Sequence, residues 1–261
     1  MKWLHLLFFS LVFALLSHQA RSDGFAAKFE SDYVLPLVKQ SPGGALVIVE
    51  NGKVVLQQVY GVRNEGESEL VTAETLFRIA SLSKTFASAA ASILVKETPL
   101  TWQAPLKSNL AHVKFKEPGY GEQISLKHLM SQSSGLMPHA YTNLIEENMS
   151  YRRIVDRLDR VDFVCAPGKC YGYQNVVFSL IADLVESETE FEYTEFVDAN
   201  LFKPLAMSRA SFGHKSFVND PNHARPHVWT GTRWASVKPT SHYYKVPPAA
   251  GVNASISDMR E

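Results

Sequence analysis

Residues 77–97 read FRIASLSKTFASAAASILVKE, and this stretch decides how the rest of the chain is interpreted. A short apolar run ends at Ala80, and a helical pattern follows it. Ser81 and Lys84 are three residues apart, and side chains at this spacing share one face of a helix. A serine hydroxyl needs a partner to accept its proton, and a lysine can do so when burial lowers its pKa. The spacing therefore predicts a serine acyl-transfer site.

The same residues also fit an ordinary helix start. In that alternative, Ser81 or Ser83 caps the helix and Lys84 is a solvated residue of the first turn. The following segment, Ala87–Ser92, consists of small residues that suit close packing in an interior. Because a solvated lysine is uncommon at a buried helix start, this context favours the catalytic interpretation.

The composition is that of an ordinary globular protein. The chain has 261 residues, of which 46% are hydrophobic and 20% charged, enough for a large core. There are 26 basic and 26 acidic residues, so the formal net charge is zero. Nothing in this balance favours nucleic acid or an anionic membrane surface as a partner. We expect no cofactor, and the oligomeric state stays open.

The first 22 residues have the pattern of a signal peptide. Lys2 supplies a positive start, Trp3–Leu16 is almost wholly apolar, and small residues precede Asp23, where we predict cleavage. The apolar run is short for a stable membrane span, although an uncleaved anchor is the alternative. We therefore predict that residues 1–22 direct the protein to the periplasm or out of the cell.

The two cysteines fit such a compartment. Cys165 and Cys170 flank Ala-Pro-Gly-Lys, and a disulfide between them would close a small loop. Two independent thiols are the alternative. We expect no metal site, since no nearby His or Cys would complete four ligands.

The order of patterns predicts an α/β (α+β) fold. Residues 44–50 and 53–60 are β-rich and flank Asn51-Gly52, the preferred pair for a tight hairpin turn. After Ser81 the chain becomes helical, which indicates an antiparallel sheet flanked by helices with an inserted all-helical part. The predicted helices are Ser83–Lys96, Ser125–Gln132, Leu144–Leu158, Asn175–Ser187 and Glu190–Phe202.

A second group of candidate residues lies between the cysteines and the fourth predicted helix. A tyrosine can pass a proton to a leaving group when neighbouring ammonium groups make its phenol more acidic. Tyr173 is the candidate for this role, and Asn175 could donate a hydrogen bond to a substrate carbonyl. The alternatives are a packing aromatic and a helix N-cap. The same Tyr-x-Asn pattern also occurs at Tyr141-Thr142-Asn143.

Several segments of the chain form an ordered set of motifs: Phe77–Lys84, Ile124–Leu136, Pro167–Asn175, Pro204–Met207 and Ala249–Met259. Taken in this order, they resemble the serine β-lactamase and penicillin-binding-protein superfamily. The similarity is to the branch that holds class C β-lactamases, D-aminopeptidase-like and DD-carboxypeptidase-like enzymes, and β-lactamase-fold esterases. It extends from about Asp32 to the end of the chain.

The resemblance implies a role for each candidate. Ser81 would be acylated, with its backbone N–H as half of the oxyanion hole, and Lys84 would act as base or electrostatic anchor. Tyr173, which follows the Pro-Gly loop as the family's tyrosine does, would relay the proton, and Asn175 would orient the substrate. A β-lactam, a D-amino peptide or an ester is the implied substrate, so a small molecule or a peptidoglycan-like compound is the expected partner.

The resemblance also implies a third motif, Lys-Thr-Gly or His-x-Gly, and none follows Tyr173. We therefore expect residues 23–261 to be a domain that is incomplete at its C-terminus and weak or inactive. The sheet part of this domain would comprise about residues 23–80 plus the C-terminal tail of the chain. The helical part would comprise about residues 81–210. The alternative function is a non-catalytic relative that binds penicillin or peptidoglycan. Gln132 stands where relatives often carry His, and we expect little effect on the chemistry.

Overall fold

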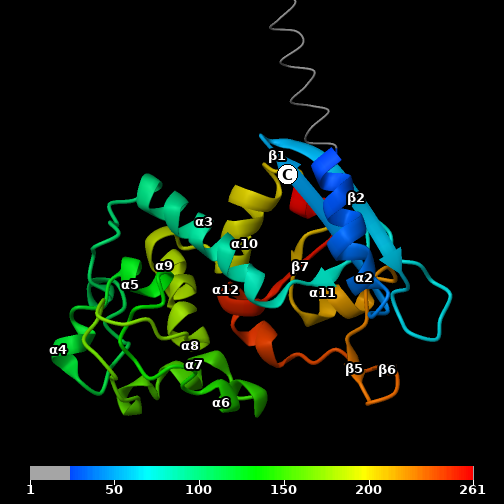
Figure 1. Cartoon of the computed structure of the whole chain (residues 1–261). Helices are drawn as coiled ribbons and strands as arrows, with labels where there is room; N and C mark the ends of the chain where they lie inside the picture. Colours follow the sequence, from blue (N-terminus) through cyan, green and yellow to red (C-terminus); the bar gives the residue numbers. More distant parts are fainter. Residues whose placement is uncertain (1–23, 261) are drawn as a thin grey trace, which may run out of the picture. The chain divides into compact units, whose positions relative to one another are not determined.

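The computed structural model describes residues 24–260, so the predicted signal peptide, residues 1–22, lies outside the described residues. The described chain divides into two compact units (Figure 1). The first unit comprises residues 24–75, 222–238 and 255–260, and the second comprises 76–221 and 239–254. Both combine helices with antiparallel strands, which confirms the predicted fold class.

A long β-hairpin forms the sheet of the first unit. Strands β1 (Gly43–Glu50) and β2 (Lys53–Gly61) pair antiparallel over their whole length. Asn51 and Gly52 connect them with φ angles of 51° and 72°. Positive φ at both central residues matches the twist of the two strands, which is why Asn-Gly is preferred here. The hairpin predicted from residues 44–60 is confirmed.

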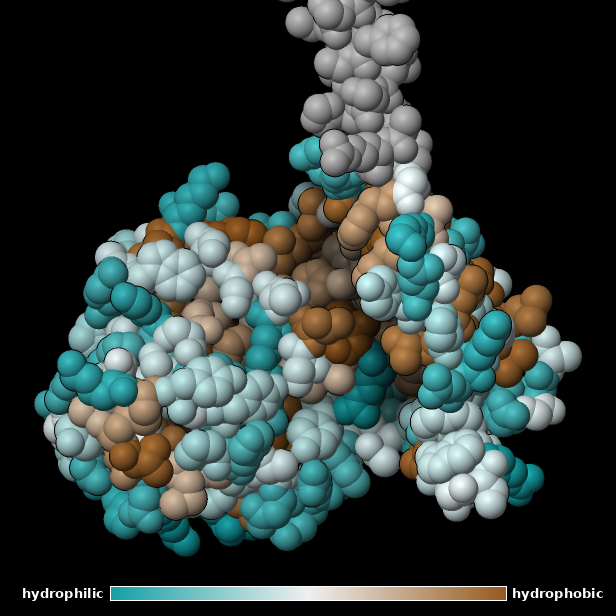
Figure 2. Space-filling view, in the orientation of Figure 1, coloured by the Kyte–Doolittle hydropathy of each residue, from teal (hydrophilic) through white to brown (hydrophobic). Residues whose placement is uncertain are grey.

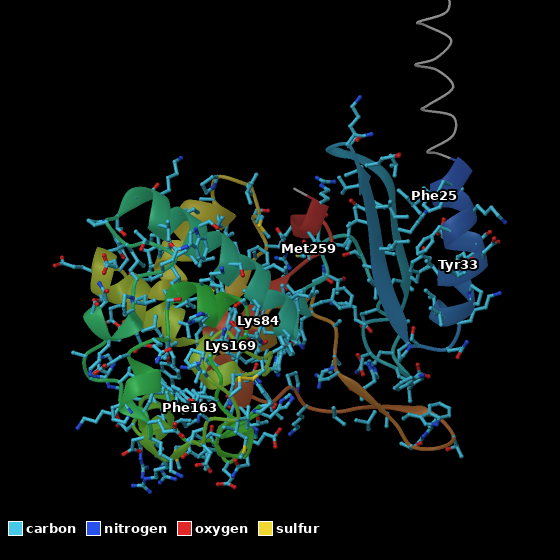
Figure 3. All side chains as sticks on the ribbon, turned by 60° about the vertical axis from the view of Figure 1, so that its left-hand side comes forward. Phe25, Tyr33, Lys84, Phe163, Lys169 and Met259 are labelled. Carbon is cyan, nitrogen blue, oxygen red and sulfur yellow. A yellow bond between two sulfur atoms is a disulfide. The ribbon has the colours of Figure 1, made fainter. Side chains whose placement is uncertain are left out.

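The chain before the hairpin is helical over residues 24–38. It includes a π-helical turn, η1 (Glu30–Val34), and α2 (Leu35–Val38). The Tyr60 hydroxyl on β2 donates a 2.6 Å hydrogen bond to the Glu30 carboxylate and ties this helix to the hairpin. Phe25 and Tyr33 project from the helix into solvent (Figure 3). Figure 2 shows brown, hydrophobic residues at the surface among teal, hydrophilic neighbours.

The first unit is completed by segments from later in the sequence. Strands β5 (His227–Trp229) and β6 (Trp234–Ser236) form a second, short hairpin. The unit ends with a 3₁₀ turn, η7 (Asp258–Arg260).

A small three-stranded sheet lies in the second unit. Its order is β3 (Phe77–Arg78), β7 (Val252–Ala254) and β4 (Ser211–Phe212), all antiparallel. The Ile79 N–H continues the ladder by donating to the Val252 carbonyl. This pairing fixes the chain immediately before Ser81.

The longest described helix of the second unit is α3 (Ser83–Glu97), which confirms the helix predicted at 83–96. Ala87, Ala90 and Ala91 on this helix are fully buried. Their small side chains let α9 (Leu180–Thr189) and α12 (Pro247–Ala250) pack closely against α3.

Shorter helices make up the rest of the second unit. They are η2 (Ala80–Leu82), η3 (Leu106–Ser108), α4 (Pro118–Gly121), α5 (Leu126–Met130), α6 (Thr142–Glu146), α7 (Tyr151–Val155), η4 (Leu158–Arg160), α8 (Asn175–Phe178), α10 (Tyr193–Val197), η5 (Asp198–Phe202), α11 (His214–Asn219) and η6 (His242–Lys245). Across residues 24–260, none is both long and apolar enough to cross a bilayer.

Three predicted helices are interrupted or shortened in the structure. The helix predicted at 144–158 is divided because Asn148 adopts a left-handed φ of 65°. The helix predicted at 175–187 is divided at Ser179 into α8 and α9. The helix predicted from Glu190 begins only at Tyr193, because Glu190 is also left-handed, with φ of 62°. A hydrophobic period does not reveal such local backbone reversals.

Candidate active site

Ser81 lies in the 3₁₀ turn η2, directly before α3, and its side chain is exposed. The residue before it, Ala80, has a φ of 46°. This left-handed conformation is uncommon for a residue with a Cβ, and such strain is often found at functional sites. The turn presents the Ser81 hydroxyl at the N-terminal end of a 15-residue helix.

The Ser81 hydroxyl contacts the phenol of Tyr173. Its Oγ lies 2.8 Å from Tyr173 Oη, although the two residues are 92 positions apart in the sequence. Among the described residues Ser81 makes no side-chain hydrogen bond to Lys84. The i, i+3 spacing predicted a direct contact between Ser81 and Lys84. In the structure the Tyr173 hydroxyl connects the two side chains instead, because Ser81 precedes the α-helix.

The Lys84 ammonium is surrounded by three acceptors. Its Nζ donates to Tyr173 Oη at 2.7 Å, to Asn175 Oδ1 at 2.9 Å and to the Ala249 carbonyl at 2.9 Å. Its side chain lies within the second unit (Figure 3). Burial lowers the pKa of Lys84, while the hydrogen bond and charge of Tyr173 act in the opposite direction. An amine with a lowered pKa gives up its proton more readily and can act as a base.

The four sequence-predicted site residues therefore come together. Ser81, Lys84, Tyr173 and Asn175 form one connected hydrogen-bond network. Asn175 is buried and is the first residue of α8, whose N-cap is Gln174. The alternative prediction, in which Asn175 is the N-cap of the helix, is therefore wrong.

A disulfide between Cys165 and Cys170 closes the loop that directly precedes Tyr173. The Gly168 N–H donates to the Ser133 carbonyl at 2.8 Å and holds this loop against the end of α5. Gly135 allows the approach, because it has a φ of 85° and a Cβ there would lie 2.3 Å from the Cys165 carbonyl oxygen. The segment Ser133-Ser134-Gly135 thus holds the disulfide-closed loop in place, through the hydrogen bond at Ser133 and the close backbone contact at Gly135.

Gln132 positions Tyr173 from both sides, which the sequence analysis missed. Its side-chain Oε1 accepts the Gln174 N–H at 2.8 Å, and its backbone carbonyl accepts the Gly172 N–H at 2.8 Å. Gln132 is buried and left-handed, with a φ of 55°. We expected little from this residue because its sequence position shows no contact with Tyr173, more than 40 residues away.

His139 is a second neighbour that the sequence did not reveal. Its backbone N–H donates to the Tyr173 carbonyl at 2.8 Å, and the two rings lie 5.4 Å apart. By contrast, the Tyr141 hydroxyl donates to the Arg157 carbonyl at 2.8 Å and is outside the network. The second Tyr-x-Asn pattern therefore does not contribute to this site.

Helix α12 and the start of β7 supply the last part of the site. Ala249 provides the carbonyl that accepts from Lys84. Three residues later, the Val252 N–H donates to the buried Ser83 hydroxyl at 3.0 Å and fixes this segment against the start of α3. Ser83 therefore has a structural hydrogen bond to the backbone of β7.

The arrangement suits nucleophilic acyl transfer. A hydroxyl, a phenol and an amine are linked in series, and an amide group lies beside the amine. No group of three or more His, Cys, Asp or Glu side chains placed to hold a metal ion occurs within residues 24–260.

Curated relatives resemble the chain over much of its length. It is 25% identical to a D-aminopeptidase of Gluconobacter oxydans (strain 621H) over 247 residues, which cover 91% of this chain and 45% of that protein. It is 27% identical to Protein flp of Staphylococcus aureus (strain NCTC 8325 / PS 47) over 179 residues, which cover 67% of this chain and 36% of that protein. The chain thus spans less than half the length of these relatives.

A solved structure and a family profile agree with this similarity. The fold matches an octameric penicillin-binding protein homologue from Pyrococcus abyssi with a TM-score of 0.71 and 21% identity, over 92% of this chain and 54% of that one. The profile of the Beta-lactamase family matches residues 31–261. The ordered segments, the fold and this match lead to one conclusion: the chain belongs to the beta-lactamase family.

Proposed function

We propose that this chain is a serine acyl hydrolase in which Ser81 attacks a substrate carbonyl. One observation carries the proposal: Ser81 Oγ, Tyr173 Oη and Lys84 Nζ form a continuous hydrogen-bonded series, with separations of 2.8 and 2.7 Å. A structural lysine would not need a lowered pKa or a phenol between itself and an exposed serine.

The geometry favours Tyr173 as the group that takes the proton directly from Ser81. Ser81 Oγ bonds to the carbonyl carbon while its proton passes to Tyr173 Oη, and the phenol proton passes to a neutral Lys84 amine. When the bond to the leaving nitrogen or oxygen breaks, the proton returns through Tyr173 to that atom. Water then attacks the acyl group, releases the acid and restores the Ser81 hydroxyl.

Two further groups would stabilise the reacting carbonyl. The N-terminal end of α3 carries partial positive charge, and the Ser81 backbone N–H would be one donor to the developing oxyanion. Asn175 Oδ1 accepts a hydrogen bond from Lys84 Nζ. The amide nitrogen Nδ2 would therefore donate a hydrogen bond to a substrate carbonyl. Lys84 thus orients both Tyr173 and Asn175.

Among the possible substrates, we propose D-amino peptides. The named D-aminopeptidase aligns with 91% of this chain. Esters and β-lactams place a reactive carbonyl in the same position, so they serve as probes of the same nucleophile. A peptide amide demands protonation of its leaving nitrogen, which the Tyr173 relay would supply.

We also propose that the protein is exported. The apolar run at residues 3–16 and the Cys165–Cys170 disulfide together favour an oxidising compartment. Mass spectrometry of the protein recovered from a secreting host should give a chain that begins at Asp23. A product that retains residues 1–22 would contradict the predicted cleavage.

Covalent labelling tests the proposed nucleophile. The purified chain is incubated with a fluorescent penicillin and with a fluorophosphonate, and the adduct is located by mass spectrometry. We expect the label on Ser81 and its complete loss in Ser81→Ala. Ser92→Ala, an exposed serine on the same helix, is the matched control and should label normally. Unchanged labelling of Ser81→Ala would remove Ser81 from the mechanism.

Turnover tests the substrate. We expect slow release of nitroaniline from D-alanine p-nitroanilide, because no Lys-Thr-Gly or His-x-Gly motif follows Tyr173, and no release from the L-isomer. Equal release from both isomers would contradict the preference for D-amino substrates. A stable Ser81 adduct without any turnover would support Ser81 as the nucleophile. It would contradict hydrolase activity and favour the alternative of a penicillin-binding relative.

A further inference from the structure

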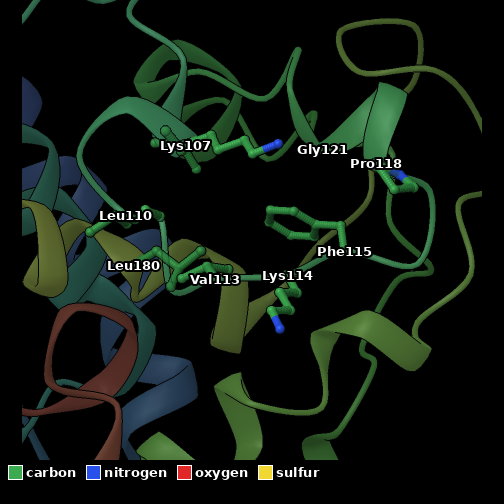
Figure 4. Close-up of a pocket in the computed structure, with 10 residues that line it drawn as sticks. Lys107, Leu110, Val113, Lys114, Phe115, Pro118, Gly121 and Leu180 are labelled. Atoms are coloured by element: carbon green, nitrogen blue, oxygen red, sulfur yellow. The ribbon is translucent and has the colours of Figure 1, made fainter.

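A cavity of about 280 Å³ lies in the second unit, away from the site residues (Figure 4). One stretch of sequence, residues 106–121, forms most of its wall, and Leu180 at the start of α9 closes it. Leu106, Leu110 and Leu180 are almost completely buried. None of Ser81, Lys84, Tyr173 or Asn175 lines it, so it is distinct from the proposed active site.

The wall of the cavity is mainly carbon. Leu110, Val113, Phe115 and Leu180 offer no hydrogen-bonding side-chain group to water. An apolar cavity about half this size stays dry and binds an apolar ring of six carbons, so this one has room for about ten carbon atoms. Filling it with an aliphatic chain would gain the dispersion contacts that the wall lacks.

Two lysines stand at the cavity, on either side of the Phe115 ring (Figure 4). The Lys107 ammonium is already paired with Glu122 at 2.8 Å. Within residues 24–260, Lys114 has no ion pair, and its side chain is exposed. An anionic group at the mouth would therefore pair with Lys114, because the Glu122 carboxylate already offsets the charge of Lys107.

We propose that this cavity binds a medium-chain aliphatic carboxylate, such as decanoate. The chain lies among Leu110, Phe115 and Leu180, and the carboxylate lies at Lys114. The apolar wall selects the aliphatic part and Lys114 selects the charge, a combination of mostly apolar lining and a few polar groups that is typical of small-molecule sites. This binding is independent of the proposed acyl-transfer activity.

A chain-length series tests the depth of the cavity. Isothermal titration calorimetry is carried out on the purified chain with hexanoate, octanoate, decanoate and dodecanoate below their micelle concentrations. Affinity should rise about fourfold for each added methylene group that is buried. It should then level off once the cavity is full. No measurable binding of decanoate, or a rise that never levels off, would overturn the proposal.

Two variants test the position of the ligand. Ala111 lines the cavity and is exposed, so Ala111→Phe should block the cavity and weaken decanoate at least tenfold without disturbing the core. Lys114→Gln should weaken decanoate about tenfold, as expected for a lost charged hydrogen bond, and leave decanol unchanged. Circular dichroism checks folding.

Lys116→Gln is the matched control. Lys116 is two residues from Lys114, is paired with Asp162 and does not line the cavity. Its replacement should leave decanoate binding unchanged. Equal losses in Lys114→Gln and Lys116→Gln would reduce the effect to general surface charge and contradict the site. Unchanged binding in a folded Ala111→Phe variant would contradict it as well.

Discussion

The proposed active site and the carbon-lined cavity belong to the same unit but are built in opposite ways. The site joins polar groups from three segments, at Ser81–Lys84, Tyr173–Asn175 and Ala249, through hydrogen bonds of 2.7–2.9 Å. Residues 106–121 form most of the wall of the cavity. A ligand in the cavity would be held by apolar contacts with this wall and not mainly by hydrogen bonds. The site should therefore respond to the loss of single atoms, and the cavity to changes in volume.

The largest expected effect is the loss of the Tyr173 hydroxyl. Tyr173→Phe keeps the ring but removes the only described link between Ser81 and Lys84, so the rate of Ser81 acylation should fall about a hundredfold or more. Stopped-flow labelling with a fluorescent penicillin measures it. Tyr141→Phe, the same change in the unused Tyr-x-Asn pattern, should acylate at the normal rate. A normal rate for Tyr173→Phe would exclude the phenol from the proton path.

The next effect is on the pH dependence of acylation. Burial lowers the pKa of Lys84 from its ordinary value of 10.5, and only the neutral amine can accept the proton. The acylation rate should therefore fall about tenfold per pH unit below that lowered pKa and be constant above it. Rates measured from pH 5 to about pH 11.5 locate the midpoint on either side of that ordinary value.

The fall in acylation rate at low pH, here called the pH limb, should disappear in Lys84→Met. This variant keeps the volume of the side chain but has no amine. An unchanged limb in this variant would assign the titration to another group. A midpoint at or above 10.5 in the unmodified protein would contradict the effect of burial on Lys84.

A smaller effect is expected at Gln132. Gln132→Leu removes the acceptor for the Gln174 N–H, so Tyr173 should lose part of its positioning and acylation should slow about tenfold. Gln132→Glu retains an acceptor oxygen and should recover most of the rate. Because a merely structural role would affect both variants through folding, the ratio of their acylation rates at equal folded fraction is the measurement. Equal rates for the two variants would exclude the positioning role.

The smallest effect on acylation is expected in the cavity. Leu110 is 1% exposed, and Leu110→Ala should lower the free energy of unfolding by about 3 kcal/mol because it enlarges the void. Urea denaturation measures this change. The acylation rate of the folded variant should stay within about twofold, since distant sites act independently. A large loss of acylation in the folded variant would show that the two regions are coupled.

The sequence by itself determined the local elements and the chemical types at the site. The Asn51-Gly52 turn, the helix after Ser83 and the Cys165–Cys170 loop follow from patterns of neighbouring residues, since a hairpin turn, a helical period and a short loop need only local information. The same local patterns nominated Ser81, Lys84, Tyr173 and Asn175.

Only the tertiary structure decided which of these groups touch. It placed Tyr173 between Ser81 and Lys84, excluded Tyr141, and brought in Gln132, His139 and the Ala249 carbonyl. A backbone carbonyl has no sequence signature, and a glutamine acceptor looks the same wherever it lies. Distances between segments separated by tens of residues depend on packing of the whole unit, which a linear pattern does not contain.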